Sequence, residues 1–177
     1  MGGGLARIPA ALERVSARIA EAGAAYPLVV VPGGGPLADA VRGMDAELGL
    51  SADTAHWMAI LAMDLYGQVL ADRIEAAELV EEPAAISEVV CRGKVAVLAP
   101  YRWMRAADVL PHTWGVTSDS IAAFIAGALD AERLVLIKPA VDGPAVDPYF
   151  NAVLPVGLPY RIVPWDTIDQ LESWLSE

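Results

Sequence analysis

Cysteine and histidine are scarce in this chain. Its 177 residues include one cysteine, Cys91, and two histidines. A single cysteine excludes a disulfide within the chain and a zinc site made of cysteines, and two histidines are few for a metal site of any kind. Because Cys91 follows two valines, we expect a buried thiol without chemical function, and we expect no metal site.

The chain also contains few positively charged residues. Twelve lysine and arginine residues stand against 23 aspartate and glutamate residues, a net charge of −11. A nucleic-acid backbone attracts a basic surface, so we expect no nucleic-acid partner. No apolar run approaches the ~20 residues of a membrane-spanning helix and no signal peptide is visible, which predicts a cytoplasmic protein without a membrane partner. The 55% hydrophobic content predicts one well-buried domain, residues 1–177.

Several nucleotide-binding and catalytic motifs are missing as well. The sequence contains no Walker A motif, no G-x-S-x-G and no H-E-x-x-H. The segment Gly33–Ala38 matches a relaxed dinucleotide fingerprint, G-x-G-x-x-A. That fingerprint requires an acidic residue at the end of a second strand ~20 residues later, where this sequence begins a long helix. A dinucleotide-binding enzyme is therefore a disfavoured alternative.

The stretch Leu28–Arg42 organises the chain around it. Leu28–Val31 is a short apolar run typical of a buried strand, and Gly33–Gly35 then allow a sharp turn with a closely approachable backbone. Pro36 suits the first turn of a helix, whose N-terminus directs free N–H groups and a positive dipole end at the loop. Three consecutive glycines favour an anion site, most often for phosphate, over a plain turn.

Strands alternate with helices along the rest of the chain, which predicts an α/β protein with a mostly parallel sheet. We expect a glycine loop at the N-terminus, an acidic connector at 78–83 and an irregular segment at 147–159. Capping residues are expected at 51–54, at Thr117 or Ser118, and at Asp166 or Thr167. The expected strands are 28–31, 86–91, 94–99, 133–138 and 160–163, and the expected helices are 8–22, one from Pro36, 56–74, 101–109, one after the cap at 117–118, and 168–175.

Ligands of such sheets bind outside the carboxyl ends of the strands, where three segments should meet. These are the glycine loop, the polar loop that ends at Asp119, and the segment Lys138–Gly143. Asp119 could position a lysine, Mg²⁺ or a substrate hydroxyl, or it could belong to a simple capping turn. Lys138 either extends to solvent or is directed at an anion.

The helix expected at 56–74 is apolar around most of its circumference, which implies deep burial or an oligomer interface. His56 and Trp57 lie on its first turn, near the expected position of the glycine loop. A single histidine at a helix start is more often structural than catalytic.

Four segments occur in the order typical of the amino acid kinase family, which the chain resembles over nearly its whole length. In that family a first strand ends in K-x-G-G and a second in a glycine-rich loop, and a T-x-D segment and a strand closing in D-V-D-G follow. The corresponding segments here are Gly2–Leu5, Pro32–Gly35, Thr117–Ser120 and Leu134–Gly143. The resemblance implies a three-layer α/β/α sandwich with a mostly parallel central sheet, whose first strand is missing from this chain.

Within this family, Asp53–Ile60 and Leu110–Ala122 resemble one subgroup, the kinases of [5-(aminomethyl)furan-3-yl]methyl phosphate in methanofuran biosynthesis and their relatives in methylotrophic bacteria. The resemblance implies phosphoryl transfer from ATP, with Mg²⁺, to a small phosphorylated or hydroxymethyl acceptor. The partner would be a small-molecule substrate, and we expect a homo-oligomer.

The resemblance also implies roles for particular residues. The transferred phosphoryl group would lie between the backbone N–H groups of two segments, Gly2, Gly3 and Gly4 on one side and Gly33, Gly34 and Gly35 on the other. Asp119 would orient lysines or assist Mg²⁺, and Lys138 would supply a cation where the family usually has threonine. Asp142 and Gly143 are further candidates for binding ATP. The candidates for binding the acceptor are Arg42, His56, Trp57, His112, Trp114 and Thr117.

Two departures from the family pattern bear on activity. The family's catalytic lysine lies two positions before the glycines, but only Met1 precedes Gly2. We therefore expect a misassigned start that omits this lysine and the first strand. The family's second lysine, in a G-G-M-x-x-K segment, has no counterpart between Pro144 and Glu177. The alternative function is thus a weak or inactive relative that serves as a ligand-binding, storage or assembly subunit.

Overall fold

The central strand of the fold is β3 (Val95–Leu98), in a computed structural model that describes residues 1–139 and 145–176. All four residues of β3 are buried. Val95 and Val97 belong to one hydrophobic cluster, and Ala96 and Leu98 belong to another. Alternate residues of a strand point to opposite faces, so helices cover both faces of this sheet and the fold has three layers, α/β/α.

Every strand pair in the described part of the chain is parallel, as predicted. β3 lies between β1 (Val29–Val30) and β2 (Ala77–Val80), in the order β1-β3-β2. A second sheet pairs β4 (Leu134–Lys138) with β5 (Tyr160–Pro164). The strands expected at 28–31, 94–99, 133–138 and 160–163 are confirmed.

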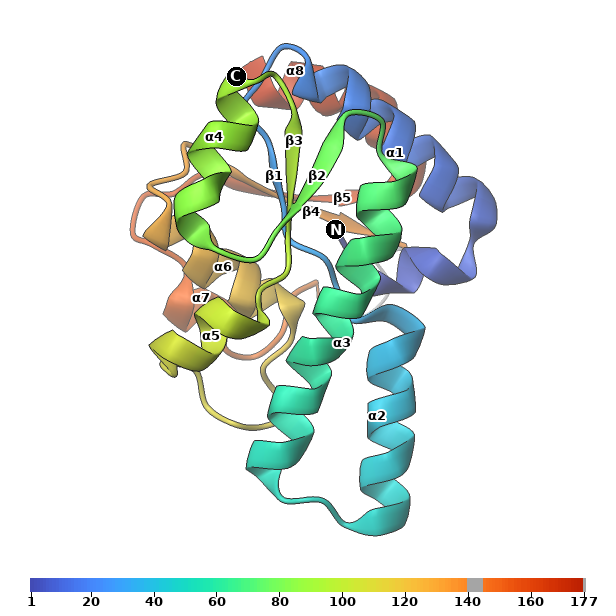
Figure 1. The fold of residues 1–177 in the computed structure, drawn as a ribbon, viewed down its shortest axis with the longest axis vertical. Coiled ribbons are helices and arrows are strands. Elements are labelled where there is room, and N and C mark those ends of the chain that lie inside the picture. Colours follow the sequence, from blue (N-terminus) through green and yellow to red (C-terminus); the bar gives the residue numbers. More distant parts are fainter. Residues whose placement is uncertain (140–144, 177) are drawn as a thin grey trace.

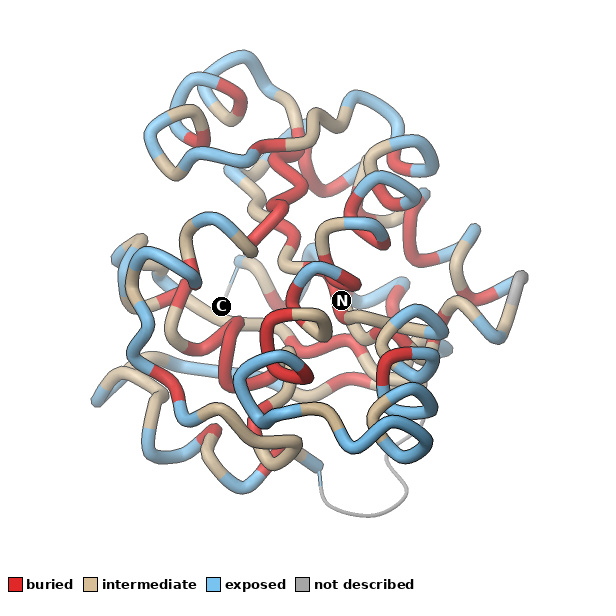
Figure 2. The backbone as a smooth tube through the Cα atoms, turned by 60° about the horizontal axis from the view of Figure 1, so that its bottom comes forward, coloured by how far each residue is buried: buried red, intermediate tan, exposed pale blue. Residues whose placement is uncertain are grey.

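Two hydrophobic clusters join the helices to the sheets, and α3 contributes to both of them (Figure 1). One hydrophobic cluster joins α1 (Pro9–Gly23), the C-terminal half of α3 (Ala52–Arg73), and α8 (Leu171–Ser176). The other cluster joins the N-terminal half of α3 to α4 (Ile86–Cys91), α5 (Tyr101–Ala107) and α6 (Ser118–Ala128). The short helix α7 (Phe150–Val153) packs on α6. Buried segments gather in the middle of the molecule and the outer turns of the helices are exposed (Figure 2).

Helices α2 (Gly35–Leu48) and α3 form a pair that extends away from the sheets (Figure 1). The expected cap at 51–54 is confirmed: Ser51 is the N-cap of α3, and its Oγ accepts a hydrogen bond of 3.1 Å from the Thr54 amide. In the described part of the chain no helix is both long and apolar enough to cross a membrane.

Two predictions between α3 and β3 are wrong. Residues 86–91 form the helix α4, not a strand, and the supposed connector at 78–83 contains β2. Ile86 and Val89 are buried three residues apart, which is helical spacing that so short an apolar run did not reveal. Cys91, at the last position of α4, is exposed, so the expectation of a buried thiol is also wrong.

The C-terminal region also differs in detail. A 3-10 turn, η3 (Trp165–Gln170), precedes α8, and Pro164 stands at its N-cap with no side-chain hydrogen bond, so the capping role expected of Asp166 or Thr167 is wrong. The Thr167 hydroxyl instead donates to the Pro164 carbonyl at 2.9 Å. The segment expected to be irregular, 147–159, contains the single turn α7.

Candidate functional site

Two glycine segments far apart in sequence cross in direct backbone contact. The Gly33 amide donates to the Met1 carbonyl at 2.8 Å. A Cβ on Gly3 would lie 2.0 Å from the Gly35 nitrogen, and a Cβ on Gly33 would lie 2.3 Å from the Gly3 nitrogen. Side-chain carbons do not approach backbone so closely, so each segment requires glycine because of the other.

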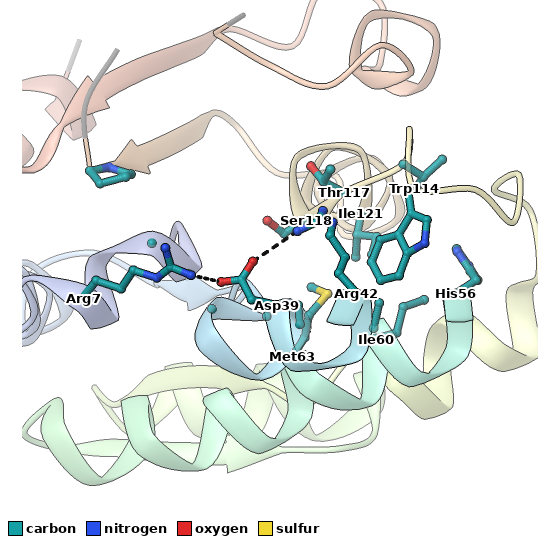
Figure 3. A pocket seen from close by; sticks show the side chains of 18 of the residues that line it. Arg7, Asp39, Arg42, His56, Ile60, Met63, Trp114, Thr117, Ser118 and Ile121 are labelled. Carbon is teal, nitrogen blue, oxygen red and sulfur yellow. Dashed lines mark hydrogen bonds and ion pairs between the residues drawn. The ribbon is translucent and has the colours of Figure 1, made fainter. Parts of the chain in front are cut away.

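A cavity of about 520 Å³ lies beside this crossing, a volume typical of small-molecule sites (Figure 3). The short 3-10 turn η1 (Gly3–Arg7), α2, α3 and the loop before α6 contribute its lining. In Figure 3, Arg7 lies at one end of the labelled side chains, and Trp114 and His56 lie at the other.

Four glycines line the cavity, and their amide groups donate no hydrogen bond within the described part of the chain; they are Gly3, Gly4, Gly34 and Gly35. Gly35, with φ of +55°, is also the first residue of α2, whose N-terminus carries a partial positive charge. Free N–H groups and a helix N-terminus together make this wall suited to an anionic group such as phosphate.

Two arginines line the cavity and share one carboxylate. Arg7, at the end of η1, and Arg42, on α2, both form ion pairs with Asp39, with Arg42 at 3.3 Å. The Arg42 guanidinium also lies over the Trp114 ring, 4.7 Å from its centroid, and Trp114 Nε1 donates to Asp45 at 2.7 Å. This part of the wall therefore combines cations with a fixed aromatic face.

Asp119 and Lys138 form a close ion pair next to the cavity. Lys138 Nζ lies 2.7 and 2.6 Å from the two carboxylate oxygens of Asp119, and the Asp119 side chain is 9% exposed. The pair joins the end of β4 to the first turn of α6. Of the two interpretations of Lys138, the one in which it extends to solvent does not hold, because Asp119 keeps its ammonium group at the ligand edge.

Asp147 is a buried carboxylate that supports the cavity-lining Thr117 and that the sequence analysis missed. It is 8% exposed, and its carboxylate accepts hydrogen bonds from the amides and hydroxyls of Thr117 and Ser120 and from the amides of Tyr149 and Phe150. Burial by itself raises the pKa of Asp147, but the hydrogen bonds from Ser120 and Thr117 outweigh burial and lower it. Its only sequence signal is an acidic residue in an otherwise apolar, proline-rich segment.

The two histidines stack on each other at the start of α3. The ring centroids of His56 and His112 are 4.4 Å apart with an interplanar angle of 19°, and Trp57 packs edge-on against both rings. His56 lines the cavity, whereas His112 and Trp57 lie behind it.

The structure places the predicted site residues in three groups. Those that line the cavity are Gly3, Gly4, Gly34, Gly35, Arg42, His56, Trp114 and Thr117. Those that lie against lining residues but not on the cavity surface are Gly2, Gly33, Trp57, His112, Asp119 and Lys138. Asp142 and Gly143 lie outside the described residues. The Thr117 hydroxyl caps α6 by accepting from the Asp119 amide and donates to Asp147, so its bonding is structural.

The site offers many donors to phosphate oxygens but few ligands to a metal ion. Free amides, two arginines and Lys138 fit phosphate oxygens. Among residues 1–139 and 145–176, no group of three or more His, Cys, Asp or Glu side chains could hold a metal ion. Because Mg²⁺ takes its ligands largely from water and substrate phosphates, it would fit this site as part of a metal–nucleotide complex and not as a resident ion.

Comparison with known proteins agrees with this arrangement. The sequence model of the amino acid kinase family matches residues 1–143. The chain belongs to the amino acid kinase family. Its sequence is 35% identical over 116 residues to the [5-(aminomethyl)furan-3-yl]methyl phosphate kinase of Methanocaldococcus jannaschii. That match covers 66% of this chain and 53% of the relative, so the chain spans about half the length of the curated relative that it matches.

Proposed function

We propose that this chain is a phosphotransferase that moves the terminal phosphoryl group of ATP, bound with Mg²⁺, to a small-molecule acceptor. The observation that carries the proposal is the wall of free amides from two crossing glycine segments, with the Asp119–Lys138 pair beside it. Phosphoryl transfer requires mainly in-line positioning and neutralisation of phosphate oxygens, and amides and a lysine supply both.

The acceptor that we propose is [5-(aminomethyl)furan-3-yl]methyl phosphate, the compound in the name of the archaeal relative. A phosphate end would meet the glycine wall and the arginines Arg7 and Arg42. The furan ring would lie among apolar lining side chains, Ile60, Met63, Val116 and Ile121. The cavity volume of about 520 Å³ is sufficient for such a small ring compound beside a phosphoryl group.

Lys138 is the cation that we assign to the transferred phosphoryl group, and Asp119 is the residue that positions it. In the structure Asp119 holds the Lys138 ammonium group with both carboxylate oxygens, which fixes its position. An approaching phosphate would add further acceptors to the same ammonium group.

The test uses the full chain with ATP, MgCl₂ and the proposed acceptor, followed by ³¹P NMR. We expect ADP and a new diphosphate signal. Lys138→Met should lower kcat at least tenfold, because removing a positioned cation costs heavily in phosphoryl transfer. Lys94→Met is the matched control, since Lys94 is the chain's other lysine and pairs with Glu78 away from the cavity.

Absence of ADP formation with this acceptor and with related hydroxymethyl compounds would contradict the proposal and favour the non-catalytic alternative. The expected homo-oligomer stays a prediction. It is supported by exposed apolar residues along α3 at helical spacing, Leu61, Leu65 and Val69, and light scattering after gel filtration tests it.

A further inference from the structure

His56 is buried and lines the cavity. The residue is 7% exposed, and its ring nitrogens take part in no hydrogen bond within the described part of the chain. His112, in contrast, is bonded at both nitrogens. Because the ring nitrogens of His56 are not fully enclosed by the protein, the imidazole is available at the cavity wall to a ligand group or to water.

The partners of His112 define its charge. Its Nδ1 lies 2.7 Å from Asp53 and its Nε2 lies 2.8 Å from Asp108, so both nitrogens must carry hydrogens to satisfy the two carboxylates. The hydrogen bond to Asp53, with a smaller contribution from Asp108, raises the pKa of His112. These contacts favour the protonated form of His112 and hold its ring in place between the start of α3 and the end of α5.

The same arrangement keeps His56 neutral. Burial, and after it the positive charge of His112, lower the pKa of His56 to about 4. Asp53 and Asp108 act in the opposite direction but do not reverse the shift. The remaining charged group of this cluster, Arg105, packs over the Trp57 ring at 4.5 Å and not on His56. At neutral pH His56 thus offers one N–H and one free lone pair to the cavity.

The two ends of the cavity differ in chemistry. The end with the glycines and Arg7 fits anions. Arg42 lies between the two ends with its guanidinium over Trp114, and His56, at the far end in Figure 3, offers a neutral acceptor. A charged His56 would repel an ammonium group, and a neutral one accepts a hydrogen bond from it. The positive charge of His112, which stacks on His56, is balanced by its ion pairs with Asp53 and Asp108.

We propose that His56 binds the amino group of the acceptor, at the end opposite the reacting phosphate, and that His112 is the residue that positions it. This assignment rests on the proposed function for the identity of the reaction, but the binding of an amine at His56 does not require catalysis. It makes His56 the determinant that distinguishes acceptors with an aminomethyl group from those without one.

The experiment is a long-range ¹H–¹⁵N NMR spectrum of the full chain, which contains only two histidines to assign. At pH 7 we expect one neutral ring, His56, and one doubly protonated ring, His112. Without ATP, furfurylamine should shift the His56 ring nitrogens at concentrations where 2-methylfuran, which lacks the amine, does not. Equal effects of the two compounds, or binding of furfurylamine without a change at His56, would overturn the assignment.

Two variants separate ring shape from hydrogen bonding. His56→Phe keeps a flat ring over His112 but has no nitrogen, so furfurylamine affinity should fall about 10- to 100-fold, the range for a hydrogen bond to a charged group. His56→Gln keeps an acceptor oxygen and should retain part of the affinity. With the proposed phosphate acceptor, His56→Phe should raise KM with little change in kcat, as expected for a residue that binds the non-reacting end.

The outcomes separate this assignment from the proposed function. If furfurylamine shifts His56 but ATP is not consumed, the kinase proposal fails and the amine site stands. If phosphoryl transfer occurs and His56→Phe leaves KM for the amine-bearing acceptor unchanged, the amine site is refuted and the kinase proposal stands.

Discussion

Replacing Asp147 by asparagine should destabilise the protein far more than a change of one atom suggests. Each carboxylate oxygen accepts three hydrogen bonds. Oδ2 accepts from the amide and hydroxyl of Thr117 and from the Ser120 amide, at 2.8–3.0 Å. Oδ1 accepts from the Ser120 hydroxyl and from the Tyr149 and Phe150 amides, at 2.5–3.0 Å.

An asparagine keeps only one of these acceptor oxygens. An asparagine would turn its NH₂ group to the Oδ1 side, because the Phe150 amide also donates to the Asp147 backbone carbonyl at 3.2 Å and keeps that partner. The Tyr149 amide then loses its acceptor, and because a donor left without a partner costs about 1–3 kcal/mol, Asp147→Asn should lower the free energy of unfolding by about 1–3 kcal/mol. The loss falls on the segment that caps α6 and places Thr117 at the cavity.

Urea unfolding followed by circular dichroism measures this loss at pH 7. The matched control is Asp72→Asn, whose side chain is 80% exposed and lies 3.6 Å from Arg73; it should change the free energy of unfolding by less than about 0.5 kcal/mol. A loss below about 1 kcal/mol for Asp147→Asn would refute the hydrogen-bond reasoning.

The lowered pKa of Asp147 also predicts that the stability of the protein falls at acid pH. The pKa of Asp147 is lowered in the folded state from its ordinary value of 3.8, so the unfolded chain takes up its proton first as pH falls. The contribution is therefore present above pH 3.8 and is lost as pH falls through the folded pKa. Asp147→Asn should lack this part of the acid dependence.

Three further predictions follow from single contacts. Gly3→Ala should destabilise the protein by about 1–3 kcal/mol, because its Cβ would lie 2.0 Å from the Gly35 nitrogen. Gly43→Ala, inside α2 with no atom within 4 Å of its Cβ, should stabilise the protein by about 0.5–1 kcal/mol. Thermal unfolding compares the two variants. The pKa of His112 is raised from 6.5 in the folded state, so protonation of His112 stabilises the fold below pH 6.5, and this contribution is lost as pH rises through the folded pKa. In His112→Asn the urea midpoint should therefore decline less between pH 6 and pH 9. Burial raises the pKa of Asp64 to about 6, so ionisation of Asp64 destabilises the fold as pH rises from about 4 to about 6. Asp64→Asn can still accept the hydrogen bond from the Tyr101 amide, and its free energy of unfolding at pH 7 should be about 1 kcal/mol higher in the same urea assay.

Contrary results would be specific for each contact. Equal unfolding temperatures for the two glycine variants would mean that the crossing can relax without cost. An unchanged pH profile in His112→Asn would mean that the carboxylate partners do not hold a proton on the ring. A loss of stability in Asp64→Asn at pH 7 would mean that the charged form is the favoured one.

Local patterns in the sequence were sufficient for the architecture. Buried runs such as Val95–Leu98 identify strands regardless of their partners, and the caps Ser51 and Thr117 act within a few residues of the chain. The alternation of strands and helices restricts the sheet to parallel pairing, because each crossover returns the chain in the same direction. The prediction of a strand at 86–91 failed because so short a segment, with four apolar residues among six, fits a strand and a helix equally well, and only packing on β3 selects between them.

The site, in contrast, depends on contacts between distant segments. The sequence by itself determined that glycines, Asp119 and Lys138 follow strands and therefore gather at one edge. Only the tertiary structure decided that the two crossing glycine segments leave no room for a Cβ, that Asp147 holds the start of α6, and that burial, and after it His112, keep His56 neutral. Local propensity acts over a few residues, whereas close approach, hydrogen bonding and pKa depend on which groups face each other across the folded chain.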